Sequence, residues 1–435
     1  MVTRENGLKY AKLIHVSVDN GQTYNSNKVY IMEELSDGRI KCEYGRVGNN
    51  LTTEYKPSSK WDSVLKQKLS KTKGYTDVTE LIAEAVTPIS KNTGHSLISS
   101  IPDEIVKELI QRLSDFANKT IKENYKVSQD AVSEQQVLAA QEILTTVTQT
   151  AAIGIDKKVL NDLLLKLYTI IPRQMRDVKH YLLDDIKTAD DLDKALGFLN
   201  NEQATLDTMA GQVELIKKQR ELDKKNEGVN EGVNEGVKTD YTILDQMGVT
   251  VEHVTDKKVI EEVKKQLEGH ARKLHRVYEV VNKKSQPRFD VLLNSSKNKL
   301  VELLWHGSRG CNWSSILQSS LLVRPAGAGY TGSMFGDAIY FSTDSDKSMG
   351  YTDGGRWAGG GANSYTYLGL FQVYLGNQKH IHKHDSTCYN LNLKDLQNEG
   401  YDSVYAHKGV SLRKDELMVY SPDQCTIKYL VELKN

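Results

Sequence analysis

Three apolar segments decide how this chain folds, and the first of them reads LLWHGS at residues 303–308. The other two read GDAIYF at residues 336–341 and DELMVY at residues 415–420. Each segment is typical of a β-strand whose apolar run is ended or interrupted by a polar residue, in turn His306, Tyr340 and Glu416. Burial of such a residue is costly unless its side chain meets a partner or a ligand. We therefore expect three strands to bring these side chains together at one binding site.

The length and composition indicate an ordinary protein of several domains. The chain has 435 residues, of which 39% are hydrophobic and 26% are charged. At about 150 residues per domain, this length predicts two to four domains. The 57 Lys and Arg residues balance the 57 Asp and Glu residues, so the formal net charge is zero. Contact with a nucleic acid would therefore need a local basic patch.

The cysteines point to a reducing compartment and away from a structural metal. The chain has four of them, widely spaced and without a C-x-x-C pair: Cys42, Cys311, Cys388 and Cys425. This pattern argues against a zinc module, and we expect buried thiols and no metal. No apolar stretch has the length of a membrane span, and the N-terminus lacks the apolar core of a signal peptide. The sequence thus predicts an intracellular protein with no membrane partner.

Residues 1–90 are expected to form a small β-sheet with one helix. Alternating apolar and polar residues predict strands at residues 11–18, 28–33 and 40–44. The sequences DNG at residues 19–21 and SDG at residues 36–38 indicate turns between them. Apolar residues recur at helical spacing from Trp61 to Leu69, which predicts the helix.

Residues 97–225 are expected to form an all-α bundle. Helical periodicity covers residues 105–116, residues 159–171 up to Pro172, and residues 192–209. Between the first two, Ser133 and Gln136 fit a capping box at the start of another helix. The segment contains no strand signal, which favours a helical domain.

The remaining chain is expected to contain a linker and an α+β domain. The tetrapeptide EGVN repeats within residues 226–238, and its glycine content favours a flexible linker. In residues 239–435, the pattern predicts a helix at residues 256–267 and strands at residues 277–281 and 299–304. The fold class predicted for the whole chain is therefore multidomain α+β.

A histidine, an aromatic ring and a carboxylate together suit cleavage of the bond between nicotinamide and ribose. The transition state of this reaction resembles an oxocarbenium ion, with positive charge spread over the sugar. A histidine can orient a ribose hydroxyl, aromatic faces can clamp the nicotinamide, and a carboxylate can favour the developing cation. His306, Tyr340 with Tyr351, and Glu416 supply these groups.

The C-terminal third resembles the catalytic domain of the poly(ADP-ribose) polymerases, whose fold is similar to that of diphtheria toxin. The resemblance implies that NAD+ is cleaved as a substrate and that His306, Tyr340 and Glu416 are catalytic. It further implies an NAD+ site made by Gly307, Ser308, Asn312, Arg324, Tyr340, Lys347, Ser348 and Tyr351.

The resemblance also assigns roles within this site. The Gly307 backbone and the Ser348 hydroxyl would hold the nicotinamide amide, with the ring between Tyr340 and Tyr351. Ser308 and Asn312 match positions used on the adenosine half, Arg324 is a substitute for an arginine near the adenine, and Lys347 matches a basic residue beside the serine. Met334 and Phe335 resemble the wall on the acceptor side.

Each catalytic candidate also has an ordinary structural explanation. A His-Gly pair after a strand is usually a turn, a Tyr between apolar residues is usually core, and a Glu in Asp-Glu-Leu is usually solvated. The joint pattern of His306, Tyr340 and Glu416, in order and accompanied by the matching glycine, serine and second tyrosine, favours the functional interpretation.

The N-terminal sequence Tyr44-Gly45-Arg46 resembles the WGR module of this family, with Tyr44 in place of the tryptophan. The resemblance implies binding to DNA strand breaks. Tyr44 could stack on a terminal sugar or base, and Arg46 could hold a phosphate with two hydrogen bonds. Lys71 and Tyr75 match further contacts, although a solvated lysine-rich helix face explains the lysines equally well.

The helical segment resembles the regulatory domain of the family, most clearly at LYTIIP in residues 167–172. The resemblance implies activation by nicked or 5′-phosphorylated DNA, a nuclear location, and transfer of ADP-ribose to proteins, including the enzyme itself. We expect a DNA-break-activated NAD-dependent ADP-ribosyltransferase that forms poly(ADP-ribose). Two alternatives remain open: a mono-ADP-ribosyltransferase of proteins or DNA ends, and a catalytically silent scaffold that binds DNA ends.

Overall fold

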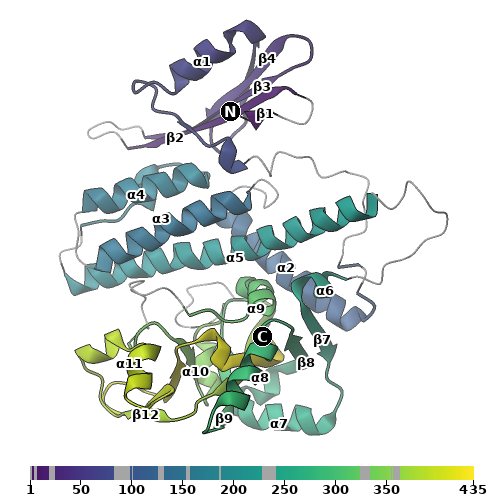
Figure 1. Cartoon of the computed structure of the whole chain (residues 1–435), viewed down its shortest axis with the longest axis vertical. Helices are drawn as coiled ribbons and strands as arrows, with labels where there is room; N and C mark the ends of the chain where they lie inside the picture. The colour runs from purple at the N-terminus through teal and green to yellow at the C-terminus, as the bar shows by residue number, and fades with distance from the viewer. Residues whose placement is uncertain are drawn as a thin grey trace, which may run out of the picture. The chain divides into compact units, whose positions relative to one another are not determined.

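The computed structural model divides the chain into two compact units (Figure 1). The first unit comprises Met1–Ser90 and Asn118–Ile216, and the second comprises Lys91–Ala117 and Lys217–Asn435. The structure describes residues 2–3, 7–18, 25–82, 98–99, 101–125, 132–152, 157–185, 188–227, 242–323, 334–353, 355 and 363–435. Helix α2 (Glu104–Tyr125) contributes to both units, so the units do not follow the predicted domain boundaries, which stay a prediction.

The first unit contains an antiparallel sheet at its N-terminal end. The strand order is β1 (Val2–Thr3), β2 (Lys9–Ser17), β3 (Ser26–Glu34), β4 (Arg39–Arg46) and β5 (Thr52–Pro57), with β6 (Thr76–Asp77) paired to β2. The three predicted strands are confirmed, and so is the helix, α1 (Trp61–Lys68), which buries Trp61 in the core of the sheet. Strand β5 was not predicted because it is exposed along nearly its whole length and has no apolar face.

The helices of the first unit pack around a core of aliphatic side chains. They are α3 (Glu134–Ala152), α4 (Lys157–Ile170) and most of α5 (Ala189–Glu227). The predicted capping box is present, because the Gln136 amide donates to Ser133 Oγ and the Ser133 amide donates to Gln136 Oε1, each at 3.1 Å. Helix α4 ends before Pro172, as predicted. Helix α5 is much longer than predicted because its apolar pattern fades before the helix ends.

The second unit is built on two sheets. The antiparallel sheet has the order β7 (Val249–His253), β8 (Leu274–Asn282), β15 (Cys425–Lys434), β11 (Tyr365–Tyr374) and β9 (Val301–Gly307). The mixed sheet has the order β10 (Ile339–Phe341), β14 (Glu416–Val419), β13 (Ser403–Ala406) and β12 (Gln378–Ile381). The predicted strands at residues 277–281 and 299–304 lie in β8 and β9, and the mixed α+β class is confirmed.

Short helices connect the strands of these sheets along the chain. They are α6 (Ile243–Met247), α7 (Lys257–Leu267), α8 (Ser285–Ser295), α9 (Trp313–Ser319), α10 (Ser345–Met349) and α11 (Leu393–Asn398). Helix α7 is the helix predicted at residues 256–267, with Asp256 as its N-cap. The repeat within residues 226–238 lies almost wholly outside the described residues.

A backbone bridge joins the two sheets of the second unit. The Trp305 amide donates to the Ser342 carbonyl oxygen at 2.8 Å, and the Ser342 amide donates to the Trp305 carbonyl oxygen at 3.0 Å. Ser342 Oγ also donates to the Asp415 carbonyl oxygen at 3.3 Å. The bridge therefore places the residue before His306 close to the residue before Glu416. Helices of membrane-spanning length and hydrophobicity do not occur in the described part of the chain, and all four cysteines are buried.

Candidate active site

His306, Tyr340 and Glu416 lie on three strands that meet at the bridge. His306 is near the end of β9, Tyr340 is the middle residue of β10, and Glu416 begins β14. His306 Nδ1 lies 3.0 Å from the Tyr340 carbonyl oxygen. In the mixed sheet, Tyr340 pairs with Met418 and Phe341 with Leu417, so Glu416 follows next along β14. The structure thus brings together the three residues that the sequence singled out.

The hydrogen bond of His306 fixes its tautomer. A carbonyl oxygen can only accept, so Nδ1 must carry the proton and Nε2 of the neutral ring is an acceptor. The rings of Phe341 and Phe371 meet the imidazole edge-on, at centroid distances of 5.8 and 5.9 Å. Burial lowers the pKa of His306 and outweighs the opposing effect of the bond to Tyr340. The His306 imidazole is therefore neutral, and its Nε2 can accept a hydrogen bond from a hydroxyl group.

The carboxylate of Glu416 is almost buried, and only one of its oxygens has a partner among the described residues. Its side chain is 9% exposed, and Oε1 forms an ion pair with Lys347 Nζ of α10. Lys347 Nζ also donates to the Lys414 carbonyl oxygen at 3.4 Å. Within the described part of the chain, Lys347 is the one polar side-chain partner of Glu416. The second carboxylate oxygen can therefore accept a hydrogen bond from a substrate.

Two tyrosines lie within electrostatic range of Glu416. Burial, followed by the charge of Glu416, raises the pKa of Tyr351 to about 12. Burial also raises the pKa of Tyr340, again with a contribution from Glu416. The Tyr340 hydroxyl donates to the Gly336 carbonyl oxygen at 2.8 Å and accepts from the Phe335 amide at 3.1 Å. Both phenols are neutral at physiological pH, and the fixed hydroxyl of Tyr340 leaves its ring face as the functional surface.

Gly307 and Ser348 are in direct contact. A Cβ atom at Gly307 would lie 1.8 Å from the Ser348 carbonyl oxygen, so only glycine fits at this position. Ser348 is 4% exposed, and its carbonyl oxygen accepts from the Tyr351 amide at 3.1 Å. Tyr351 itself is 39% exposed. This arrangement places a backbone segment, a hydroxyl group and an open aromatic face together, which are the features that a flat carboxamide ring requires.

Comparison with known proteins identifies the family of this chain. Residues 255–435 match the model of the poly(ADP-ribose) polymerase catalytic domain. Over 165 residues, the chain is 30% identical to "Putative poly [ADP-ribose] polymerase-like 100L" of Invertebrate iridescent virus 6, covering 37% of this chain and 86% of that protein. "Uncharacterized protein 101L" of the same virus is 30% identical over 208 residues, or 47% of this chain and 77% of that protein. The chain belongs to the poly(ADP-ribose) polymerase family.

A longer but weaker similarity extends over most of the chain. "Poly [ADP-ribose] polymerase 1" of Danio rerio is 24% identical over 384 residues, which is 81% of this polymerase-family chain and 35% of the fish protein. The family membership makes the protein an NAD+ ADP-ribosyltransferase, with NAD+ as its substrate. The roles of individual site residues stay predictions.

The adenosine side of the transferase site is only partly described. Asn312 Nδ2 donates to Ser308 Oγ at 3.0 Å, so these two predicted contacts lie together. Arg324 lies outside the described residues, as does the rest of residues 324–333. Lys347 is paired with Glu416, which the sequence alone did not reveal. On the acceptor side, Met334 is partly buried and Phe335 lies in the core beside the Tyr340 hydroxyl.

In the first unit, the predicted DNA contacts Tyr44 and Tyr75 belong to an aromatic cluster. Tyr44 stacks on Tyr30 at a centroid distance of 5.6 Å, and Tyr30 meets Tyr75 edge-on at 6.3 Å. Lys68 Nζ lies 3.8, 5.9 and 5.6 Å from the ring centroids of Tyr30, Tyr44 and Tyr75. The spacing of seven residues from the buried Trp61 places Lys68 on the same helix face, but Lys68 was not among the predicted DNA contacts. Lys71 is exposed.

Arg46 has a different environment from these residues. Its guanidinium donates to the carbonyl oxygens of Met175 at 2.9 Å and Arg176 at 2.6 Å, and to Asn25 Oδ1 at 3.2 Å. All of these contacts lie within the first unit. A phosphate contact by Arg46 would therefore have to share or replace these hydrogen bonds, and its predicted role in DNA binding is untested.

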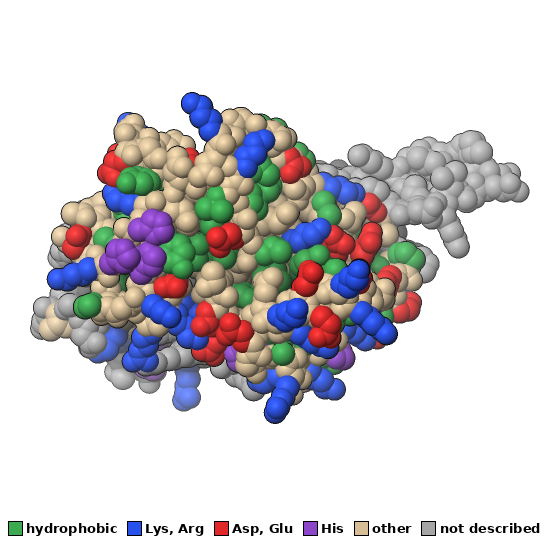
Figure 2. All heavy atoms as spheres, turned by 90° about the horizontal axis from the view of Figure 1, so that it is seen from below, with side chains coloured by type: hydrophobic (Ala, Val, Ile, Leu, Met, Phe, Trp, Pro, Cys, Tyr) green, Lys and Arg blue, Asp and Glu red, His purple; other side chains and the backbone are tan. Residues whose placement is uncertain are grey.

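Histidines gather on one face of the second unit without forming a metal site (Figure 2). The rings of His382 and His407 stack at 4.2 Å and 11°, so their in-plane lone pairs do not converge. His380 Nδ1 lies 2.8 Å from His407 Nε2, which is a hydrogen bond between imidazoles. No group of three or more His, Cys, Asp or Glu residues among those described has the arrangement that holds a metal ion.

Proposed function

We propose that this transferase cleaves the bond between nicotinamide and ribose in NAD+ and passes ADP-ribose to proteins, itself included, extending the product into a polymer. The observation that carries this proposal is the Glu416 carboxylate on a strand close to that of the neutral His306. Lys347 holds one of its oxygens, and the other has no hydrogen-bond partner among the described residues. The fit of the site to NAD+ is supported by the Gly307 and Ser348 contact, where a Cβ atom has no space.

Each site residue would have a definite role in NAD+ cleavage. The Gly307 backbone and Ser348 hydroxyl hold the nicotinamide amide, while the rings of Tyr340 and Tyr351 flank the nicotinamide plane. His306 Nε2 accepts a hydrogen bond from a ribose hydroxyl. As the carbon–nitrogen bond breaks, its electron pair moves to nicotinamide, and the charge of Glu416 stabilises the cationic sugar.

Elongation adds a proton transfer. The hydroxyl of an existing ADP-ribose unit attacks the anomeric carbon, a carbon–oxygen bond forms, and Glu416 accepts the hydroxyl proton as a general base. Lys347 orients the carboxylate before the transfer. Met334 and Phe335 would border the path of the acceptor. These steps need no oxidant and no metal ion, because the leaving nicotinamide takes the electron pair.

We also propose that DNA breaks activate the enzyme through the first unit. Tyr44, Tyr75 and Lys71 would contact the broken end, where an aromatic face can stack on a terminal base and cations can hold phosphate. Lys68, which lies over three tyrosine rings, adds positive charge to this face. DNA breaks as a partner favour the nucleus as the working compartment, and the helical segment would couple the two events.

The test is NAD+ consumption by the pure full chain, with and without a nicked duplex that carries a 5′-phosphate. The proposal predicts nicotinamide release that increases on addition of the duplex, and a ladder of labelled protein products on a gel. A single discrete product would establish mono-ADP-ribosylation instead. Absence of NAD+ turnover with the duplex present would leave a scaffold that binds DNA ends. An intact duplex of the same sequence is the control for the break.

A further inference from the structure

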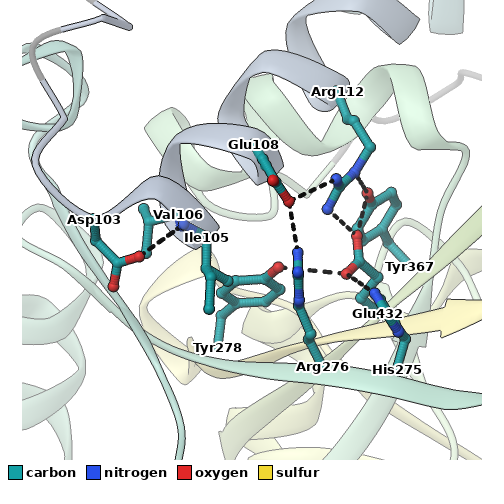
Figure 3. Close-up of polar contacts among 10 residues, drawn as sticks. All are labelled: Asp103, Ile105, Val106, Glu108, Arg112, His275, Arg276, Tyr278, Tyr367 and Glu432. Carbon is teal, nitrogen blue, oxygen red and sulfur yellow. Dashed lines mark hydrogen bonds and ion pairs between the residues drawn. The ribbon is translucent and has the colours of Figure 1, made fainter.

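One face of helix α2 contacts the sheet that carries His306. Glu108, Arg112 and Phe116 recur every four residues and therefore lie on the same side of the helix. All three belong to residues 91–117, which form one compact unit with the sheet. Figure 3 shows Glu108 and Arg112 pointing from the helix toward a group of polar side chains on the strands.

Arg112 pairs with a carboxylate that water cannot reach. The side chain of Glu432, on β15, has 0% exposure, and its Oε1 accepts from Arg112 Nη2 at 2.5 Å. Burial by itself would lower the pKa of Arg112, but its hydrogen bonds with Tyr367 and Glu432 raise that pKa overall. His275 Nε2 lies 3.9 Å from Glu432 Oε2, and Arg276 is also within electrostatic range of the carboxylate. Because a guanidinium stays protonated, helix α2 supplies a permanent counter-charge that hydrogen bonds directly to Glu432.

The remaining acceptor sites of this network are also filled. The Tyr367 hydroxyl donates to Glu432 Oε1 at 2.9 Å, and the Tyr278 hydroxyl donates to Oε2 at 3.3 Å. The Arg112 guanidinium lies 4.6 Å from the centre of the Tyr365 ring. Glu108, nearer the start of the helix, accepts from Arg276 at 2.9 Å. Glu432 thus depends at once on groups from strands β8 and β11 and from helix α2.

The same helix face reaches toward the NAD+ site. Tyr367, one partner of Glu432, precedes Leu368 and Gly369, which pair with Gly307 and His306 across the sheet. The Phe116 ring meets Tyr367 edge-on at 6.3 Å.

Phe116 also packs against the turn between Ser308 and Asn312. A Cβ atom at Gly310, within that turn, would lie 2.9 Å from Phe116 Cδ2. The Gly310 amide also donates to Asp353 Oδ2 at 2.8 Å. The helix face therefore supports both the strand beside His306 and the turn that carries the adenosine-side residues.

We propose that residues 104–117 of helix α2 are a positioning element of the transferase site and support NAD+ binding. This inference rests on the proposed function, in which Ser308 and Asn312 hold the adenosine half. Arg112 fixes the sheet through Glu432, and Phe116 fixes the Gly310 turn. Loss of either contact weakens NAD+ binding, and a helix that only covered the site would have the opposite effect.

The test compares full-length variants by steady-state kinetics at a temperature well below unfolding. Phe116→Ala is expected to raise KM for NAD+ roughly tenfold with kcat changed less than about twofold, since it disturbs the turn and no reacting atom. Inhibition by free nicotinamide should stay unchanged, because nicotinamide does not reach the adenosine side. Gln111→Ala is the matched control, as Gln111 is exposed on the same helix. A merely structural role would lower the melting temperature without this selective change in KM.

Arg112→Met tests the charged half of the inference and is expected to raise KM for NAD+ and lower the melting temperature. If this variant does not fold, the double variant Arg112→Met with Glu432→Gln removes the unpaired charge and is expected to recover folding while KM stays raised. Unchanged or lowered KM in both Phe116→Ala and the foldable arginine variant would overturn the positioning role. Absence of NAD+ turnover by the wild-type chain would instead overturn the proposed function itself.

Discussion

Glu416 and Glu432 are both buried carboxylates paired with a cation, yet their environments differ in one respect. Glu432 has Arg112, Tyr367 and Tyr278 around it, and both of its oxygens are engaged. Glu416 has Lys347 on one oxygen, and its other oxygen has no hydrogen-bond partner among the described residues. A saturated carboxylate stabilises the fold, whereas a carboxylate with a spare acceptor can act on a substrate. The same substitution at the two positions should therefore have different consequences.

Glu416→Gln should produce the largest effect, on catalysis. The amide keeps the shape of the side chain but cannot accept a proton, so elongation should fall by about 100-fold or more, as expected for loss of a general base. The free energy of unfolding should fall by about 1 kcal/mol or less, because the side chain loses one charged contact and the amide oxygen can still accept from Lys347. Product ladders and chemical denaturation measure the two quantities, and a ladder of unchanged length would remove Glu416 from this role.

Glu432→Gln should produce the next largest effect, on stability. The substitution replaces charge-assisted hydrogen bonds by neutral ones at a site with 0% exposure, and the unfolding free energy should fall by about 2–3 kcal/mol. At saturating NAD+, kcat should stay within about threefold of wild type, since Glu432 touches no reacting atom. Urea denaturation and NAD+ turnover on the same preparation provide the comparison. Wild-type stability with lost kcat would reverse the assignment of the two carboxylates.

Lys347→Met tests whether the cation paired with Glu416 matters for catalysis. The side chain of Lys347 is 16% exposed, and its loss leaves Glu416 without its counter-charge. Turnover should fall by about tenfold, one order less than for Glu416→Gln, because the carboxylate remains but is less well oriented. Lys379→Met, which breaks a surface pair with Glu399, is the matched control. Equal losses in the two lysine variants would show that the pairing with Glu416 has no special role.

The smallest expected effect is a displaced pH dependence. Because burial lowers the pKa of His306, the ring should stay neutral below the ordinary histidine pKa of about 6.5. The acid limb of kcat/KM for NAD+ should therefore lie below pH 6.5. The unfolded chain takes up this proton first, so the contribution of His306 to stability is complete above about pH 6.5 and declines as the pH falls below it. A limb centred above pH 7 would contradict a neutral His306.

The sequence predicted those parts of the molecule whose signal is local. Strands β2, β3 and β4, the Ser133 capping box and the end of α4 before Pro172 each depend on residues a few positions apart. His306, Tyr340 and Glu416 were found because each interrupts an apolar strand. The Trp305 and Ser342 bridge brings the strands that carry them together.

Contacts between residues far apart in the sequence could not be predicted from local patterns. Arg112 and Glu432 are 320 positions apart, and an arginine on an amphipathic helix ordinarily indicates a solvated face. The pairing of Lys347 with Glu416 was missed for the same reason. Strand β5 was missed because all but one of its residues are exposed, which removes the alternation that marks a half-buried strand.

The most direct test of the account measures the product ladders and melting temperatures of Glu416→Gln and Glu432→Gln side by side, as full-length chains with a 5′-phosphorylated nicked duplex. The account predicts truncated products at a wild-type melting temperature for Glu416→Gln, and a full ladder at saturating NAD+ with a lowered melting temperature for Glu432→Gln. A full ladder from Glu416→Gln would contradict it.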